Sequence, residues 1–543
     1  MAKKAMTPPE DFKDVHFPSA GVDGSVAFGR QPNRPIGARG QFRRTCVSAK
    51  NVQSIDPETR RNRGGSRGGL NRFLNDPISG DRFIAQDIET ISTVGTPVAS
   101  NSGRVVTAVA VSEGRLFYAN EGATSWTEAT NNTGLTPPLR FSGILFSTAL
   151  QQKRWYVDRL NSVVFSPALG TVELWTATDG EFPVDSDNNL PRLIETWRGR
   201  IILSGLLKDP QNIFMSKVDN PYNFDYSPLS PSALDAVALN IPDGLGLIGD
   251  MVTGIVPYTD DLLIIGCDGS LRIIRGDPLA GGQVDTISRS MGMAWGRAWA
   301  RDQSGNIYFF SNHCSVCILV PGQMPQVISQ PIDHLLRNIN TGDNAIRLLW
   351  DERNKKLKVF VTSLDGPNEN DMHYQWEQRT GAWFPFQYAN PDHNPLCCCT
   401  YDGNDPDDRV PLIGSWDGVV RTISESATTD DGTRIDSEVL IGPFVSKDFA
   451  ELTIRDALPV MGMNSNPVYY DVLTGRSPEE ALASTPKETG VWQPGRGFSS
   501  YLNWSGHAIY FKIRSQPTLP NDWSMESVRI TLRDRGRLRA RQQ

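Results

Sequence analysis

Two groups of cysteine and histidine side chains are the residues best suited to metal chemistry. They are His313, Cys314 and Cys317 in one stretch and His393, Cys397, Cys398 and Cys399 in another. A Cys-x-x-Cys pair joined to a second cysteine cluster can close a four-ligand zinc site. The four ligands would be Cys314, Cys317, Cys397 and Cys399. Both stretches also have the pattern of a buried β-strand, and free thiols are common in protein cores. We therefore predict core thiols and no cofactor, with structural zinc as the alternative.

Motifs for other catalytic chemistry are sparse. The six His residues form no H-E-x-x-H motif, and the chain has no G-x-x-x-x-G-K-[ST] phosphate loop. The run Arg63-Gly-Gly-Ser-Arg-Gly-Gly69 lacks the strand and helix of a phosphate cradle, so we predict a flexible or closely packed backbone there. Many Asp residues could supply the carboxylate pair of a glycosidase. Because no such motif is complete, we predict that the chain is not an enzyme.

Arginine placement is the strongest polar signal in the sequence. The 543 residues carry a formal charge of −7, with 41 Arg against 13 Lys. Arg30 to Arg72 carries +9 and Arg529 to Arg541 carries +5, which leaves −21 for the rest. Basic ends on an acidic body indicate that the ends contact something other than solvent. Phe42 is the one aromatic residue between Arg30 and Arg72. Proteins that bind single-stranded nucleic acid usually combine basic residues with several aromatic residues, on which the bases stack. We therefore favour neighbouring subunits over nucleic acid.

The guanidinium fork binds carboxylates with two parallel hydrogen bonds, so these arginines suit acidic surfaces of neighbouring subunits. The predicted subunit-docking arm comprises Arg30, Arg34, Arg39, Arg43, Arg44, Arg60, Arg61, Arg63, Arg67 and Arg72. The predicted C-terminal basic tail comprises Arg529, Arg533, Arg535, Arg537, Arg539 and Arg541.

Composition excludes several classes of protein. Seven Cys are too sparse for a disulfide scaffold, and 13 Trp, 22 Phe and 13 Tyr can build large cores, which excludes disorder for most of the chain. The apolar runs are too short for a spanning helix, and the first residues show no secretory h-region. We therefore expect folding in a reducing cytoplasm, with free thiols.

The elements that must position these residues are short strands separated by turns. Leu262 to Arg275 and Leu412 to Arg421 both read as apolar strand, Asp-Gly turn, apolar strand. Hairpin units of about 40 to 45 residues with four short strands are typical of β-propeller blades. We predict an all-β fold with a propeller over residues 91–435, of six to eight blades with seven favoured. Two stacked sandwiches are the rival arrangement.

The segments before and after the predicted propeller have different sequence patterns. Residues 1–90 are predicted to form an extended Arg-rich N-terminal arm, which would lie over a partner or over its own body if ordered. Residues 436–543 are predicted to form a C-terminal β-sandwich. Its core would contain Trp492, Trp504 and Trp523. Leu335–Leu349 and Pro478–Ala483 are the helix candidates.

Several stretches resemble tail proteins of short-tailed bacteriophages. Cys46 to Phe73 resembles the opening of podovirus-like head-to-tail proteins, which runs into an R-G-G-x-R-P-G-L-like turn; this chain has Gly68 in place of Pro. Asp209 to Asp225 resembles their x-x-F-x-S-x-x-D-x-P-x-x-F-D blade. Further likenesses, to a late blade and to the final strands of tail hub or nozzle (tail tubular) proteins, lie in Arg347–Val361, Tyr374–Trp383, Phe511–Ser515 and Ser527–Arg533.

The resemblance implies a structural virion protein of the tail, assembled in the host cytoplasm, without a membrane span or catalytic residues. Its subunits would form a homo-oligomeric, hexameric ring below the portal adaptor protein. The ring would continue and gate the channel for ejection of double-stranded DNA and would hold tail fibre or spike proteins. An acidic body would repel passing DNA phosphates. Deleting residues 1 to 72 is then expected to leave a folded propeller that no longer assembles.

Two other functions fit a propeller. A β-propeller lectin or receptor-binding virion protein would expose aromatic residues at the mouth of the propeller. A propeller glycosidase would need two carboxylates about 5 to 9 Å apart in a pocket.

Overall fold

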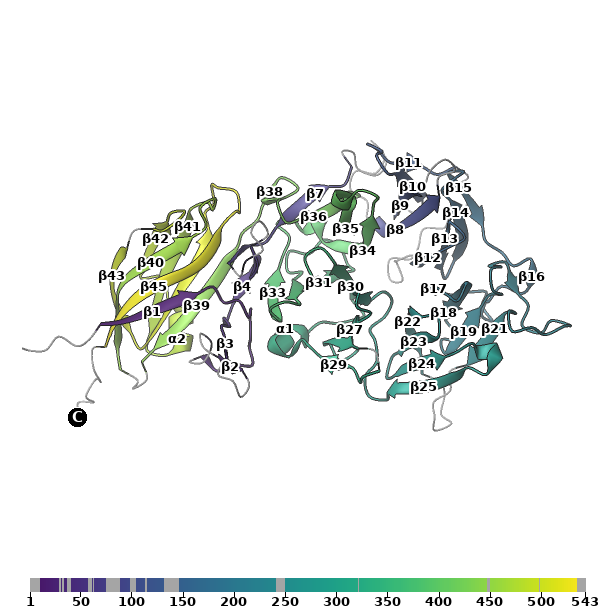
Figure 1. Ribbon diagram of the computed structural model, residues 1–543, viewed down its shortest axis with the longest axis horizontal. Helices are drawn as coiled ribbons and strands as arrows, with labels where there is room; N and C mark the ends of the chain where they lie inside the picture. Colours follow the sequence, from purple (N-terminus) through teal and green to yellow (C-terminus); the bar gives the residue numbers. More distant parts are fainter. Residues whose placement is uncertain are drawn as a thin grey trace, which may run out of the picture.

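The protein is a ring-shaped β-propeller beside a β-sandwich (Figure 1). The N-terminal segment, which is the described part of residues 10–74, runs between them. This computed structural model describes residues 10–28, 31, 34–36, 41–56, 61, 63–74, 88–97, 104–112, 115–130, 146–240, 250–320, 322–446, 450–497 and 499–534. The predicted all-β class is confirmed. No helix in these ranges is long and apolar enough to cross a membrane.

Seven antiparallel sheets, each built on four strands, form the blades of the propeller. Blades 1 and 2 contain β8 (Ile88–Pro97), β9 (Arg104–Ser112), β10 (Arg115–Asn120) and β11 (Thr127–Glu128), then β12 (Phe146–Leu150), β13 (Lys153–Asp158), β14 (Asn161–Ser166) and β15 (Thr171–Leu174). Blades 3 and 4 contain β17 (Leu193–Trp197), β18 (Arg200–Ser204), β19 (Asn212–Met215) and β21 (Val237–Asn240), then β22 (Val252–Thr259), β23 (Leu262–Cys267), β24 (Leu271–Arg275) and β25 (Gln283–Ser288).

The ring continues with three more blades, so the described part of the chain forms seven blades, the number favoured from the sequence. Blades 5 and 6 contain β26 (Trp299–Arg301), β27 (Ile307–Phe310), β28 (Val316–Leu319) and β29 (Gln326–Val327), then β30 (Asn344–Asp351), β31 (Lys356–Ser363), β32 (His373–Glu377) and β33 (Ala382–Phe386). Blade 7 contains β34 (Pro395–Asp402), β35 (Arg409–Ser415), β36 (Val420–Ser424) and β7 (Gly69–Arg72), extended by β37 (Thr429–Asp430) and β38 (Thr433–Arg434).

Blade 7 is completed by a strand from the N-terminal segment. Strand β7 pairs antiparallel with β36, with Leu70 opposite Ile423. The two ends of the propeller chain therefore meet in one sheet, which closes the ring. Closure removes an exposed sheet edge of the kind that invites aggregation.

The sandwich consists of two antiparallel sheets, and each of them contains strands from the N-terminal segment. One sheet contains β43 (Ser500–Gly506), β40 (Leu452–Met461), β45 (Ser524–Asp534), β6 (Gly64–Ser66) and β5 (Val52–Gln53), with β1 (Glu10–His16) also paired to β45. The other contains β4 (Ala49–Lys50), β39 (Glu438–Val445), β44 (Ala508–Ser515), β41 (Val468–Gly475) and β42 (Glu488–Trp492). The N-terminal segment thus forms strands in both domains of its own chain.

The remaining elements are short. Two strand pairs are β2 (Arg34–Ile36) with β3 (Gln41–Arg43), and β16 (Asp179–Gly180) with β20 (Asn223–Phe224). Among the described residues the helices are α1 (Asp333–Leu336) and α2 (Pro478–Ala483), and 3-10 turns lie at Pro278–Ala280, Gln330–Ile332, Pro391–His393 and Pro406–Asp408.

Two local predictions need correction. The helix predicted over Leu335–Leu349 is wrong beyond Leu336, because the Asn340 side chain accepts a hydrogen bond from Gly342 N (2.9 Å) in a turn and β30 follows. Trp492 and Trp523 are buried as predicted, but Trp504 is 37% exposed and its indole N–H donates to Glu488 Oε2 (2.6 Å). The helix over Pro478–Ala483 is confirmed, with Ser477 Oγ accepting from Glu480 N.

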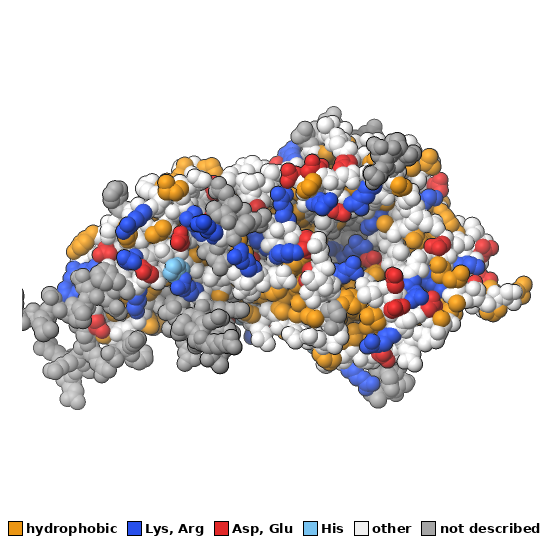
Figure 2. Space-filling view, in the orientation of Figure 1, with side chains coloured by type: hydrophobic (Ala, Val, Ile, Leu, Met, Phe, Trp, Pro, Cys, Tyr) orange, Lys and Arg blue, Asp and Glu red, His pale blue; other side chains and the backbone are white. Residues whose placement is uncertain are grey.

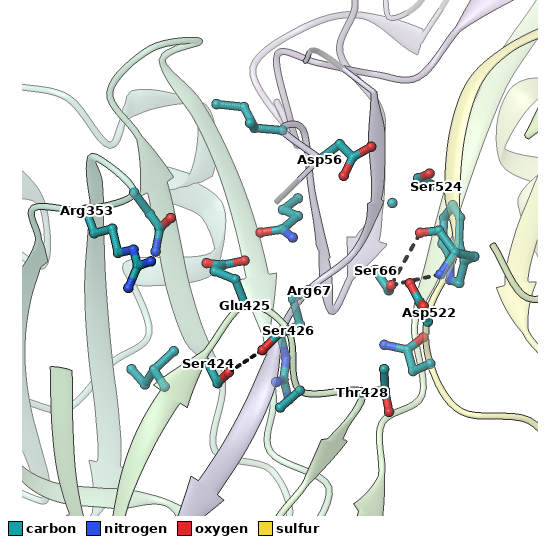
Figure 3. A pocket seen from close by; sticks show the side chains of 18 of the residues that line it. Asp56, Ser66, Arg67, Arg353, Ser424, Glu425, Ser426, Thr428, Asp522 and Ser524 are labelled. Atoms are coloured by element: carbon teal, nitrogen blue, oxygen red, sulfur yellow. Dashed lines mark hydrogen bonds between the residues drawn. The ribbon is translucent and has the colours of Figure 1, made fainter. Parts of the chain in front are cut away.

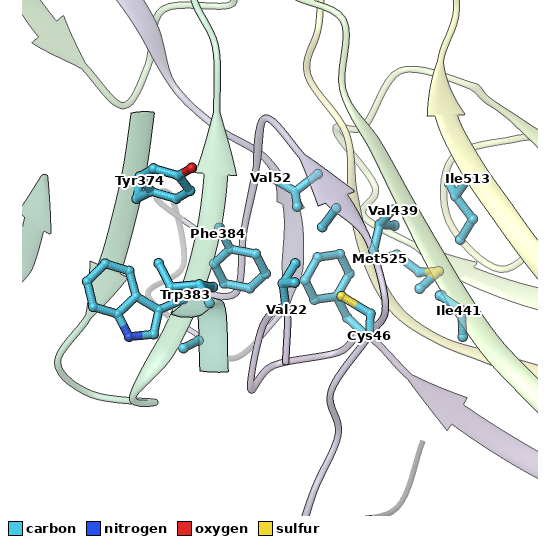
Figure 4. Close-up of a cluster of buried hydrophobic side chains, with 14 of the residues drawn as sticks. Val22, Cys46, Val52, Tyr374, Trp383, Phe384, Val439, Ile441, Ile513 and Met525 are labelled. Atoms are coloured by element: carbon cyan, nitrogen blue, oxygen red, sulfur yellow. The ribbon is translucent and has the colours of Figure 1, made fainter. Parts of the chain in front are cut away.

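One hydrophobic core crosses the boundary between the two domains (Figure 4). Trp383 and Phe384 of the propeller face Val22 and Val52 of the N-terminal segment, and the sandwich adds Val439 and others on the far side. Val22 N donates to Trp383 O (2.9 Å), which fixes the backbone of the segment against blade 6. The segment is therefore the middle layer of a continuous core.

Candidate functional site

The glycine run predicted to be flexible or closely packed is closely packed. A Cβ on Gly65 would overlap the carbonyl oxygen of Trp523 in the sandwich, and a Cβ on Gly69 would overlap that of Thr429 beside blade 7. Gly64 lies against the ring of Phe17 in the same way. The glycine positions of the run therefore have no room for a side chain, because backbones and rings approach them closely as the chain passes from the sandwich to the propeller.

Arg67, in the middle of this run, is the most completely bonded arginine of the junction. Its Nη1 and Nη2 donate to the two carboxylate oxygens of Asp430 at 2.9 and 2.7 Å. Its Nε donates to Asn51 Oδ1 (3.0 Å), and the two remaining N–H groups donate to the carbonyls of Gly68 (2.7 Å) and Gln387 (2.9 Å). All five donors of the fork are used.

Burial and charge oppose each other at Arg67. Its side chain is 6% exposed and that of Asp430 is 0% exposed. Burial alone would lower the pKa of Arg67, but the charge of Asp430 and the hydrogen bonds to it raise the pKa instead. The guanidinium also lies 5.2 Å from the ring centre of Tyr388. Since this pair is internal, the structure corrects the prediction that Arg67 docks on a neighbouring subunit.

A second buried polar group joins strand β5 to the propeller. Lys356 Nζ, 3% exposed, donates to Glu425 Oε1 (2.8 Å) and to Gln53 Oε1. Burial raises the pKa of Glu425, but the charges of Lys356 and Lys358 outweigh it and lower the pKa to about 2. This ionised pair remains together over the whole neutral range, and it ties the segment to blades 6 and 7.

Between the domains lies a polar pocket of about 1000 Å³ (Figure 3). Figure 3 shows Arg353 and Glu425 on the propeller side and Asp522 and Ser524 on the sandwich side, with Ser66 between them. Its charged lining comprises Arg63, Arg67, Arg353, Arg409, Asp56, Asp351, Asp407, Glu425 and Asp522. The described lining therefore carries charges of both signs.

The other arginines of the predicted docking arm lie in different environments. Arg63 Nη2 lies 3.3 Å from Glu526 Oε2, and Arg72 Nε lies 2.9 Å from Asp431 Oδ1 with 47% of its side chain exposed. Arg44 is half-buried and Arg61 is exposed. Arg34 and Arg43 lie in β2 and β3, and Arg30, Arg39 and Arg60 lie outside the described residues. For these residues docking stays a prediction.

The C-terminal basic tail begins inside strand β45. Arg529 binds Asp14 of β1 with two hydrogen bonds, Nε to Oδ1 at 2.7 Å and Nη2 to Oδ2 at 3.1 Å. Arg533 lies opposite Glu10 in the same strand pair. The rest of the predicted tail, Arg535, Arg537, Arg539 and Arg541, lies outside the described residues.

The two cysteine groups lie in different blades and do not form one site. Cys317 packs in a cluster between blades 4 and 5, whereas Cys397 and Cys399 pack in a cluster between blades 1 and 7. Cys314 Sγ donates to Ile339 O (3.2 Å). No group of three or more metal-ligating side chains occurs among the described residues. The four-cysteine zinc alternative is therefore wrong.

A second cavity, of about 270 Å³, opens at the centre of the propeller. Glu195 is the one carboxylate among its described lining residues, and Arg297 Nη2 donates to it at 2.7 Å. The carboxylate pair of a glycosidase is therefore not present in the described lining of this cavity. Sequence reasoning missed this group, because each charged residue stands alone in its own strand.

Comparisons with known proteins bear on the fold alone. No protein-family model matches the chain, and no curated protein matches it by sequence. The extracellular domain of a hybrid two-component system from B. thetaiotaomicron is 11% identical with a TM-score of 0.41, covering 66% of this chain and 42% of that one. YCF48 from Cyanidioschyzon merolae is 8% identical (TM-score 0.38, 65% and 98% covered). BBS1N, solved in complex with ARL6DN, is 9% identical (TM-score 0.39, 66% and 99% covered). This chain therefore spans less than half the length of the first of these proteins. Its blades are defined by its own hydrogen-bonded sheets.

Proposed function

We propose that the chain is a structural subunit of the tail of a short-tailed bacteriophage. In this proposal it forms a hexameric hub or nozzle ring below the portal adaptor, continues the DNA channel and holds fibres or spikes. The proposal starts from the sequence resemblance, and the structural role of the resembling residues supports it.

The observation that carries the proposal is the position of the R-G-G-x-R-like turn. In this chain the turn is Arg63 to Leu70, and it passes directly from sandwich strand β6 to propeller strand β7. Its glycines have no room for side chains, and Arg67 binds Asp430 with both nitrogens. These residues fix two domains in one body, which is what a load-carrying subunit of a tail requires.

The blade-like stretch Asp209 to Asp225 has a structural role of the same kind. Phe224 is fully buried and packs against Phe182, with ring centres 5.2 Å apart. Pro221 O accepts a hydrogen bond from the indole N–H of Trp175 (2.9 Å). Residues that carry the resemblance thus build blades, which agrees with a family whose members are structural.

Large exposed hydrophobic side chains on both domains supply contact surface for neighbours. Leu229 in the propeller is 105% exposed, and Met463 and Tyr501 in the sandwich are 80% and 73% exposed. In the proposed ring these side chains would lie in contacts between subunits. The exposed arginines Arg61 and Arg72 would dock on acidic surfaces of the next subunit.

The proposal is tested on virions of the phage that encodes the chain. Immunogold labelling with an antibody against the full chain is expected to mark the tail, with peptides of the chain recovered from purified particles. Absence of the chain from particles, or labelling confined to the head, would contradict the proposal.

Ring formation is tested separately by light scattering and electron microscopy of the purified 60.0 kDa chain. Six copies per particle are expected. Reversing charge in the double variant Arg61→Glu, Arg72→Glu should reduce ring formation at least tenfold. Arg337→Glu, exposed and paired with Asp333 on the propeller, is the matched control and should leave rings intact. If both variants assemble like the unmodified chain, the arm is not the docking element.

A further inference from the structure

The outer edge of blade 4 is a long strand edge with no strand beside it in the described part of the chain. Strand β25 has six residues and pairs with β24 on one side only. The outer strands of blades 1, 2, 3 and 5 have two to four residues. Figure 2 shows basic and acidic side chains beside each other at the lower edge of the propeller, where Figure 1 places β25. An open edge presents N–H and C=O groups with which another chain can pair.

Backbone hydrogen bonds at both ends of β24 fix which of its residues face β25. Before the strand, Cys267 N donates to Ser270 O (2.9 Å), and after it Gly276 N donates to Asp261 O (2.8 Å). Both bonds join an even-numbered residue next to β24 to the β23 side of the sheet. Residues of an antiparallel strand bond alternately to the strands on either side. The even-numbered residues of β24 therefore bond to β23, and the odd-numbered ones bond to β25.

The same alternation determines which groups of β25 are left open. Gln283 and Asp285 lie opposite odd-numbered residues of β24, so their N–H and C=O groups are used within the blade. Those of Val284 and Thr286 therefore point away from β24. Both residues are exposed, Val284 to 40%. Within the described part of the chain, neither makes a backbone hydrogen bond to an element outside the blade.

A groove of about 880 Å³ lies along this open edge. Its lining includes β25 from Val284 to Ser288 and, from blade 5, Met324, which is 64% exposed. Arg289 follows the strand, also lines the groove and is exposed. Arg275 Nε, by contrast, already donates to Asp285 Oδ2 (2.7 Å). The groove thus offers an incoming chain open backbone groups, two apolar side chains and the guanidinium of Arg289.

Two other blades of this protein are covered at their outer edges by extended segments of its own chain. On blade 6, Asn51 N of the N-terminal segment donates to Pro385 O of the outer strand β33 (3.2 Å). On blade 7, Asp431 N donates to Leu70 O of β7 (2.9 Å), and β37 lies parallel to that strand. Outer blade edges of this fold therefore accept extended chain segments.

We propose that the β25 edge of blade 4 binds an extended acidic segment of another protein, which adds to the blade as a further strand. The backbone of this segment would pair with Val284 and Thr286. An acidic side chain would pair with Arg289, and an apolar one would contact Met324. In strand addition the main-chain hydrogen bonds supply affinity and the side-chain contacts select the sequence. The inference rests on the geometry of blade 4 and not on the proposed role in a tail.

The test uses the full chain and two fluorescein-labelled peptides, one of three Glu-Val repeats and one of three Lys-Val repeats. Fluorescence anisotropy should show that the acidic peptide binds at least tenfold more tightly than the basic one. Thr286→Pro should weaken binding of the acidic peptide about tenfold or more, because it removes an outward N–H. Proline is tolerated on edge strands, and this N–H makes no bond to β24. Leu174→Pro is the matched control on the edge strand of blade 2, where Leu174 is 72% exposed, and should leave the affinity unchanged.

Hydrogen exchange locates the bound peptide. At saturation, exchange should slow at least threefold in residues 283–288 and should not change in β15. If Thr286→Pro fails to fold, Arg289→Glu keeps the backbone and should weaken the acidic peptide while tightening the basic one, each at least threefold. Equal affinities for the two peptides, unchanged exchange in residues 283–288, or unaltered affinities in Arg289→Glu would overturn the proposal. So would protection of β25 that increases with the concentration of the chain alone, since the edge would then belong to a second copy.

Discussion

Arg67 is the residue on which the junction between the domains depends most. Its bidentate pairing chemistry follows from residue type, but its partner Asp430 lies 363 positions away in the sequence. Sequence reasoning therefore predicted an arginine that binds a carboxylate and assigned the carboxylate to the wrong molecule. The burial of Arg67 argues against docking on a neighbouring subunit, because a buried guanidinium with all its hydrogen bonds made has no donor left for one.

Substituting Asp430→Asn should destabilise the chain by about 3–5 kcal/mol, because it leaves the buried charge of Arg67 without its counter-ion. The free energy of unfolding would be measured by urea titration. Asp402→Asn is the matched control: Asp402 also lies 2.7 Å from an arginine, Arg104, but is 60% exposed. Its loss should stay below about 1 kcal/mol. Equal losses in the two variants would show that the buried pair contributes nothing beyond a surface pair.

A buried chain of His373, Asn394 and Asp371 gives blade 6 a pH response. Val361 N donates to His373 Nδ1 (3.2 Å), and Asn394 Nδ2 donates to Asp371 Oδ2 (3.1 Å). Burial lowers the pKa of His373 from its ordinary 6.5 to about 3, and burial raises that of Asp371 to about 6. The unfolded chain therefore takes up a proton at His373 well before the folded chain does. At Asp371 the order is reversed.

Acidification from pH 7 to 5 should consequently cost about 2 kcal/mol of stability through His373. His373→Gln should reduce the fall in unfolding free energy over this interval by that amount. Asp371→Asn should make the fall steeper, because it removes a group that stabilises the folded state as pH decreases through about 6. Urea titrations at pH 7 and pH 5 measure the fall in unfolding free energy for the unmodified chain and for each of the two variants. An identical fall in all three proteins would rule out His373 and Asp371 as the source of the pH response.

At the scale of elements, the four-residue strand β7 closes the propeller. It is the fourth strand of blade 7, so a chain lacking residues 1 to 72 would lack part of a blade as well as sandwich strands β1, β4, β5 and β6. The expectation that such a truncation leaves a folded propeller therefore does not suit this topology. Loss of folding would precede any loss of assembly.

A smaller change tests the same element. Gly69→Ala should destabilise the chain by about 1–3 kcal/mol, since the added Cβ overlaps Thr429 O and forces β7 from its place. Hydrogen exchange should show faster exchange in β36, the strand that pairs with β7. Gly269→Ala is the control, because the nearest atom to its added Cβ is 3.5 Å away. Unchanged exchange in β36 with Gly69→Ala would show that β7 does not hold the blade.

Elements with strong local signals were predictable and those built over long range were not. The hairpin around Asp268-Gly269 and the helix over Pro478–Ala483 have turn and cap residues beside them, and both are confirmed. Strand β4 is two residues long and pairs with β39, hundreds of residues away, so no local pattern could reveal it. Strand β5 is also two residues long and pairs with the short strand β6, which is too little sequence for a strand pattern. Arg297 and Glu195 of the central cavity were missed because the closed ring brings them together.

At the scale of the whole molecule, the shared core makes the propeller and sandwich one cooperative unit. Phe17 of the N-terminal segment lies 6.4 Å from both Phe384 of the propeller and Trp523 of the sandwich, measured between ring centres. Apolar burial on this scale dominates over the few ion pairs at the boundary. The two domains should therefore unfold in one transition.

Phe384→Ala should uncouple that transition. Phe384 is fully buried, and its truncation should cost about 3–5 kcal/mol while removing contacts between domains. Thermal unfolding followed by hydrogen exchange should then resolve two steps, one in β44 of the sandwich and one in β35 of the propeller. Phe165→Ala is the matched control, since Phe165 is also fully buried but packs within blades 1 and 2. It should lower the single transition of both strands together. If Phe384→Ala also keeps β44 and β35 in one step, coupling between the domains rests on the polar contacts of Arg67 and Lys356 rather than on the core.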